Sequence, residues 1–185
     1  DDDTRVVEFN LTKVDDQQVR IDLDEISAIA GREINPEIQS HYGGAFNDRG
    51  DQLMIPMPNN TFYSFVIFDI ELNGTNSAFQ SVTINQVVDA DNIPYDLQDG
   101  LSNIKFVAGN YYACSLNGAV RINPQGQKAK IFQQWIVDIF EYDGKLYATD
   151  VNTGLYESED DGLSWDQVNK EREPTGIFFA ENVND

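Results

Sequence analysis

The chain has 185 residues, and 32 acidic against 12 basic side chains give it a formal net charge of −20. A surface this negative repels phosphate backbones and anionic lipids, which excludes nucleic-acid binding as an expected function. A single cysteine and a single histidine exclude an internal disulfide and a Cys/His zinc site. No apolar run is long enough to predict a transmembrane segment. With 41% hydrophobic residues, we expect a folded, acidic, β-rich module that carries no cofactor and no metal.

Three aspartates, Asp1 to Asp3, open the chain. We expect residues 1–5 to be a disordered acidic tail and residues 6–185 to form the folded domain. The acidic start resembles the mature N-terminus of bacterial outer-membrane lipoproteins, in which acidic residues follow an acylated cysteine. That resemblance implies export to the periplasm or cell surface and a lipid anchor upstream of Asp1.

Alternating apolar and polar residues predict strands in residues 7–11, 19–23 and 81–85. Residues 62–72 are apolar on both faces at first and then alternate, which is typical of a strand that leaves a covered core for solvent. Ile26, Ile29 and Ala30 have helical spacing after Asp24, a residue that can cap a helix. Because Gly31 follows at once, we expect no more than one short helical turn there. Asn-Gly and Asp-Gly pairs recur along the chain and favour tight hairpin turns.

A repeat in the second half of the chain is the strongest organising signal. Gly109 to Cys114, then Gly118 and Gly126, match Gly144 to Thr149, then Gly154 and Gly162, at an offset of 35 to 36 residues. A fainter copy begins at Gly50. A period of this length, built from short strands and glycine turns, predicts all-β propeller blades that must stack to bury both faces. The expected fold is an all-β β-propeller, or a partial propeller, of four-stranded blades.

The second copy carries the pattern Ser-x-Asp-x-Gly-x-x-Trp, which resembles the Asp-box of the bacterial neuraminidase repeat. The positions that define it are Ser158, Asp160, Gly162 and Trp165. A carboxylate and a hydroxyl can accept backbone N–H groups across a tight turn, the glycine can adopt a positive φ, and the indole can cover the turn. The resemblance implies a structural role away from the ligand face. The matching positions of the earlier copy are Ile122, Pro124, Gly126 and Ala129, so only the glycine is retained.

The resemblance also raises the question of catalysis. Sialidases of this family clamp the substrate carboxylate with three arginines, the first in an Arg-Ile-Pro motif. Here Met54 stands before Ile55 and Pro56, and no arginine cluster is visible. We therefore predict that the chain is not an enzyme and has no catalytic residues. His41 is interpreted as a surface residue and Cys114 as a buried, inert thiol.

In a propeller, the turns between second and third strands share one face with the links between blades. The repeat places on this predicted ligand face Asn59, Asn60, Tyr95, Asp96, Asn117, Trp135 and Asn152. Asparagine and aromatic side chains suit glycan or peptide recognition, although the same residues also suit ordinary polar loops.

The expected function is a non-catalytic exported recognition or scaffold module, a lipoprotein subunit of a larger envelope complex that binds a protein or glycan partner. Two alternatives remain: the ligand-binding propeller part of a larger glycan-processing enzyme, and an assembly factor. Residues 176–185 resemble residues 136–143, the predicted first strand of a blade. We expect the natural protein to continue past Asp185. Pairing of this segment with the first strand of the chain, or assembly with other copies or a partner, would also complete the blade.

Overall fold

The computed structural model describes residues 6–10, 18–31, 44–58, 62–72, 79–94 and 101–169. These residues form three four-stranded antiparallel sheets, a two-stranded sheet and one helix. The all-β prediction is confirmed. In the described part of the chain the three sheets stay open and do not close into a ring. The predictions for residues 1–5 and 176–185 concern positions outside this part.

The N-terminal layer consists of β1 (Val6–Asn10) paired with β2 (Gln18–Asp22), followed directly by α1 (Leu23–Ala30). The expectation of one short helical turn was wrong, because α1 has eight residues. Gly31, at φ 68°, ends the helix as the sequence indicated. The helix is stabilised by Ile26, which is fully buried against apolar side chains of the first large sheet. No helix of the described residues is both long and apolar enough to cross a membrane.

The first sheet has the order β3-β4-β5-β6, with strands β3 (Ala45–Phe46), β4 (Gln52–Pro58), β5 (Phe62–Leu72) and β6 (Phe79–Pro94). The second sheet consists of β7 (Leu101–Val107), β8 (Asn110–Ser115), β9 (Gly118–Ile122) and β10 (Lys128–Phe132). The third consists of β11 (Ile136–Tyr142), β12 (Lys145–Asp150), β13 (Gly154–Ser158) and β14 (Asp166–Asn169). In all three sheets every strand pairs antiparallel with its neighbour in the sequence.

The sequence repeat corresponds to these sheets strand by strand. Gly50, Gly109 and Gly144 occupy the turn between the first and second strands of each sheet, with φ of 71°, 75° and 73°. Gly126 and Gly162 occupy the turn between third and fourth strands at φ of 77° and 80°. These positive φ angles are strained for residues with a Cβ atom. The repeated glycines therefore mark equivalent turns in successive sheets.

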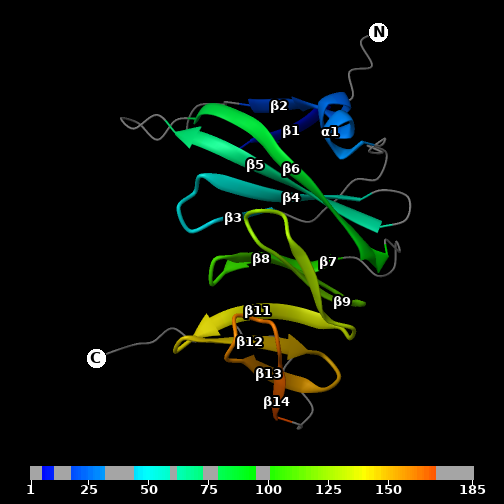
Figure 1. Cartoon of the computed structure of the whole chain (residues 1–185), viewed down its shortest axis with the longest axis vertical. Helices are drawn as coiled ribbons and strands as arrows, with labels where there is room; N and C mark the ends of the chain where they lie inside the picture. The colour runs from blue at the N-terminus through cyan, green and yellow to red at the C-terminus, as the bar shows by residue number, and fades with distance from the viewer. Residues whose placement is uncertain are drawn as a thin grey trace.

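The layers stack in one column, from the N-terminal layer through the first, second and third sheets (Figure 1). An apolar core lies at each of the three junctions. The middle sheet is covered on both faces, so all six residues of β8 are buried. Tyr111 belongs to the core against the first sheet, whereas Tyr112 belongs to the core against the third. Because both faces of this strand are covered, its residues do not alternate between apolar and polar as they do in a strand with one face in solvent.

The antiparallel order gives the column two different ends. We call the end with the turns between first and second strands and between third and fourth strands the turn end. It includes residues 47–51, 108–109, 123–127, 143–144 and 159–165. We call the opposite end the link end. It includes the turns at 116–117 and 151–153 and the link 133–135 between the second and third sheets.

Candidate binding pocket

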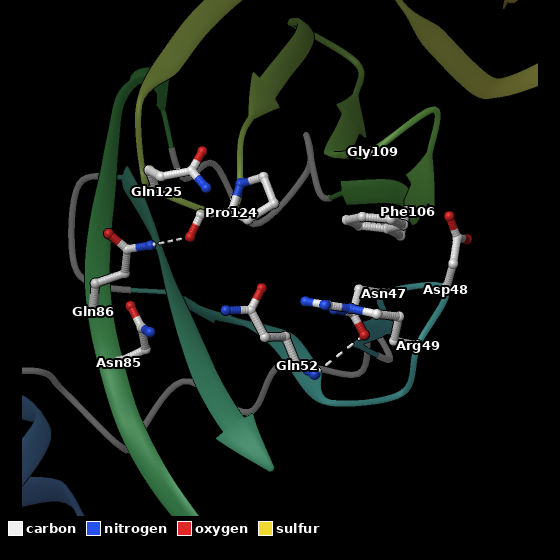
Figure 2. Close-up of a pocket in the computed structure, with 10 residues that line it drawn as sticks. All are labelled: Asn47, Asp48, Arg49, Gln52, Asn85, Gln86, Phe106, Gly109, Pro124 and Gln125. Carbon is white, nitrogen blue, oxygen red and sulfur yellow. Dashed lines mark hydrogen bonds between the residues drawn. The ribbon is translucent and has the colours of Figure 1, made fainter. Parts of the chain in front are cut away.

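A pocket of about 620 Å³ opens at the turn end between the first and second sheets. Its lining residues are Asn47, Asp48, Arg49, Gln52, Asn85, Gln86, Phe106, Gly109, Pro124 and Gln125. Figure 2 shows Gln86 and Phe106 on opposite sides of this space, with Gln52 rising between them. The volume lies in the range of small-molecule sites in proteins.

The orientation of two pocket carboxamides is set by Asp69 on β5. One oxygen of its carboxylate accepts a hydrogen bond from Gln52 Nε2 at 2.9 Å, and the other accepts one from Asn85 Nδ2 at 2.6 Å. A carboxylate can only accept, so it holds each amide nitrogen towards itself. The two side chains enter the pocket from β4 and β6 in a fixed orientation (Figure 2).

A β-bulge explains why the adjacent residues Asn85 and Gln86 both line the pocket. The register passes from Ile67 opposite Gln86 to Phe68 opposite Ile84, so Asn85 is an extra residue on β6. In a regular strand, neighbouring side chains point to opposite faces. A bulge interrupts that alternation and redirects a side chain, and bulges occur often beside functional sites.

The turn between β3 and β4 is held by Asn47, which is 8% exposed. Its side-chain oxygen accepts the backbone N–H groups of Asp51 and Gln52 at 3.0 and 3.2 Å, and its Nδ2 donates to the Asp51 carboxylate at 2.5 Å. Arg49 lies on the rim and forms an ion pair with Asp51 at 3.2 Å. The cation of this rim therefore has an anionic partner in the same turn.

Phe106, from β7, is the aromatic side chain of the pocket. Its ring is half-buried and meets the Tyr111 ring edge-on, with centroids 4.8 Å apart. Tyr111 is fully buried, and its hydroxyl has no hydrogen-bond partner among the described residues. Burial raises the pKa of Tyr111 well above its ordinary value, and the charges of Asp51 and Asp69 add to that effect. The phenol is thus a neutral support beneath Phe106.

The turn between β9 and β10 closes the pocket from the second sheet. Gln86 Nε2 donates to the backbone oxygen of Pro124 at 2.8 Å and so joins the two sheets. The Gln86 amide lies directly over Gly126, where an added Cβ would approach its oxygen to 2.1 Å. The turn is held by Asn123, whose side-chain oxygen accepts the backbone N–H groups of Gln125 and Gln127 at 3.1 and 2.8 Å.

The chemistry of this lining suits recognition. Five of the lining side chains are carboxamides, each of which offers both a donor and an acceptor and does not titrate. A carboxamide is a poor general acid or base, because those roles need a pKa near the working pH. The described residues contain no cluster of three or more His, Cys, Asp or Glu side chains that could hold a metal ion.

The Ser158–Trp165 turn lies at the turn end of the third sheet, away from this pocket. Asp160 Oδ1 accepts backbone N–H groups of Leu163 and Ser164 at 3.1 and 2.8 Å, and Ser158 Oγ accepts that of Gly162 at 2.9 Å. Trp165 Nε1 donates to the Gly162 backbone oxygen at 3.2 Å. The Trp165 ring packs against the Phe132 ring of the second sheet, with ring centroids 4.9 Å apart. Its four defining residues thus come together in one turn.

This turn also contacts the second sheet directly. The Tyr112 hydroxyl donates to the backbone oxygen of Asp161 at 3.3 Å. An added Cβ on Gly162 would come within 2.8 Å of that hydroxyl. The turn therefore docks one sheet on the next through Tyr112 as well as through Trp165.

The predicted ligand face is described only in part. Asn59, Asn60, Tyr95 and Asp96 lie outside the described residues. Asn117, Trp135 and Asn152 all lie at the link end, where Trp135 is 38% exposed and its backbone oxygen accepts the N–H of Val151. Asp150 is fully buried there and accepts the backbone N–H groups of Asn152 and Thr153. The ligand role of these residues stays a prediction.

His41 also lies outside the described residues, whereas Cys114 is described and buried as predicted. Burial raises the pKa of the Cys114 thiol, which keeps it protonated and unreactive.

Sequence reasoning missed the pocket at the turn end. One signal was available. Residues on one face of a regular strand are all even-numbered or all odd-numbered, yet the apolar residues Val82, Ile84 and Val87 all pack towards the α1 layer, although 84 and 87 have opposite parity. That change of parity indicates a bulge at Asn85 and Gln86. In comparisons with known proteins, no protein-family model and no curated protein matches the chain.

Proposed function

We propose that this chain is a non-catalytic recognition module that binds a protein or glycan partner at a cell envelope. The observation that carries the proposal is the carboxamide-lined pocket between the first and second sheets. Its groups are held before any ligand arrives, Gln52 and Asn85 by Asp69 and Gln86 by the Pro124 oxygen. A site whose hydrogen-bonding groups are already oriented loses less entropy on binding.

We also propose that the stacked sheets are blades of an Asp-box β-propeller, or of part of one. Three features support this architecture: consecutive four-stranded meanders, face-to-face packing, and turn glycines at matching positions. The hydrogen bonds around Asp160 and Ser158 support an Asp-box role for that turn. The place at the envelope is proposed from the resemblance of Asp1 to Asp3 to the acidic segments of bacterial outer-membrane lipoproteins.

Arrays of glycans and of extracellular peptides, probed with the purified chain, test the recognition role. We expect binding to at least one class of array member and a loss of tenfold or more, about 1.4 kcal/mol, in the double variant Gln52→Ala/Asn85→Ala. Asp166→Asn, at an exposed position on β14 of the third sheet, is the control and should bind like the parent. Absence of binding to any member, or binding that the double variant retains, contradicts the proposal.

Mass spectrometry of each bound ligand after long incubation tests the absence of catalysis. Recovery of the ligand unchanged supports a recognition module. Conversion of a glycan into product contradicts it and favours the alternative, a part of a glycan-processing enzyme.

A further inference from the structure

The pocket contains acceptor atoms that no described residue uses. Gln52 and Asn85 each give an amide N–H to Asp69, and within the described part of the chain their side-chain oxygens accept no hydrogen bond. The Gln125 side chain, exposed on the opposite wall, makes no hydrogen bond to any described residue. A ligand would therefore meet at least two oriented acceptors and one free carboxamide. A hydroxyl group, which donates and accepts at once, complements both kinds of group.

The charges around the pocket select against an anionic ligand. Arg49 is the one basic residue of the lining, and its guanidinium is already paired with Asp51. Asp48 lies beside it on the rim, Asp69 lies behind Gln52 and Asn85, and the whole chain carries a net charge of −20. An anion would enter a negative field in which the one cation among the lining residues already has an anionic neighbour. A neutral ligand meets no such barrier.

Phe106 gives the pocket an apolar wall across from its polar side chains. The edge contact with Tyr111 fixes the ring from behind, while its half-buried state leaves part of it open to the pocket. Figure 2 shows the ring across the space from Asn85 and Gln86. A sugar ring has the matching character, with polar hydroxyl edges and an apolar C–H face that can stack on an aromatic ring.

We infer that this pocket binds a neutral carbohydrate, whose hydroxyl groups pair with Gln52, Asn85 and Gln125 and whose apolar face stacks on Phe106. The inference rests on the proposed recognition function and names its ligand class. A peptide that binds by adding a strand to an open sheet edge fits less well. This pocket presents side chains and turns instead. The site also lies at the turn end, opposite to the predicted ligand face.

Titration calorimetry with glucose, galactose, N-acetylglucosamine and their disaccharides tests the inference, with glucuronate as the anionic comparison. We expect saturable binding of at least one neutral sugar and at least about tenfold weaker binding of its acidic counterpart. Phe106→Ala should weaken binding about tenfold or more, and Phe106→Tyr should retain it because the ring survives. Sugar binding that Phe106→Ala leaves unchanged overturns the inference.

Gln125→Ala keeps the test valid if the Phe106 variant does not fold. The Gln125 side chain is exposed and makes no hydrogen bond to any described residue, so its loss should leave the melting temperature unchanged. We expect about three- to tenfold weaker sugar binding, the value of one hydrogen bond. Asp166→Asn, at an exposed position on β14 of the third sheet, should bind like the parent. An unchanged affinity in Gln125→Ala overturns the site.

A photo-crosslinking amino acid at position 85 separates failure of the inference from failure of the proposed function. If no neutral sugar binds but position 85 cross-links a peptide that the array identified, the sugar inference falls and the recognition function stands. If neither sugars nor peptides bind, both fall.

Discussion

At the residue scale, Asp160 is a charged cap of the turn in the third sheet. The pKa of Asp160 is lowered from its ordinary 3.8 to about 2, first by the hydrogen bond from the Ser164 hydroxyl, then by the Ser164 backbone and the Ser158 hydroxyl. A folded-state pKa below the unfolded value means that ionised Asp160 contributes stability above about pH 4. That contribution is lost as the pH falls through about 2.

We predict that Asp160→Asn unfolds more readily than the parent at about pH 6, and that this difference shrinks at about pH 2, where the Asp160 carboxylate of the folded parent is half protonated. Urea unfolding at the two pH values measures the difference. Asp166→Asn, at an exposed position on β14, controls for the change in net charge. A difference between Asp160→Asn and the parent that is equal at both pH values would show that the charge of Asp160 does not support the turn.

The two tryptophans of the chain allow a matched comparison. Trp165 is half-buried against Phe132 and donates to the Gly162 oxygen, whereas Trp135 is 38% exposed. Trp165→Ala should cost about 2–4 kcal/mol of unfolding free energy, at or below the range for a fully buried aromatic residue. Trp135→Ala should cost less than about 1 kcal/mol. Equal losses for the two variants in denaturant unfolding would falsify the docking role of Trp165.

At the element scale, the glycines of the repeat are required for two different reasons. Gly144 has φ of 73° and open space around the missing side chain. Gly118 has φ of 130°, and an added Cβ would lie 2.1 Å from the Phe132 backbone oxygen. The first glycine therefore serves only the turn conformation, while the second also allows two backbone segments to approach closely.

We expect Gly144→Ala to cost about 1 kcal/mol, the strain of the left-handed conformation. Gly118→Ala should cost about 3 kcal/mol or more, because backbone atoms of the β10–β11 link would have to move. Thermal unfolding of both variants, followed by circular dichroism, measures the difference. Gly118→Ala that melts at the temperature of Gly144→Ala would contradict the close approach.

The elements also show what the sequence could and could not predict. Local patterns predicted the strands and turns, because glycine spacing and alternation depend on neighbours in the chain. The length of α1 was underestimated because Ile26 is stabilised by burial against the first sheet, a contact that no local pattern contains. The pocket was missed for the same reason: Gln52, Asn85 and Gln125 come from three separate segments that only the stacking of two sheets brings together.

At the scale of the whole molecule, the column predicts a gradient of local stability. The second sheet is packed on both faces, and β8 is hydrogen-bonded to strands on both sides. The third sheet shares a described core only with the second, and β14 lies at its edge. In stacked architectures of this kind, each unit is stabilised by its nearest neighbours.

We therefore predict that backbone amides of β8 exchange with deuterium at least about tenfold more slowly than those of β14. Hydrogen exchange measured by mass spectrometry at neutral pH tests this directly. The amides of β12, which lies inside the third sheet, should give intermediate rates. Uniform exchange across the three sheets would show that the column opens only as a whole and that no gradient exists.

The order of the strands has a further consequence, for the rate of folding. In each sheet every strand pairs with its neighbour in the sequence, and tight turns join most of these pairs in the second and third sheets. Such contacts span few residues, so little loop entropy is lost before they form, and the hairpins can form independently. Folding rates fall as the mean sequence separation of contacts rises. This chain should therefore fold faster than a β-sandwich of similar length whose strands cross between sheets, with docking of the preformed sheets as the slower step.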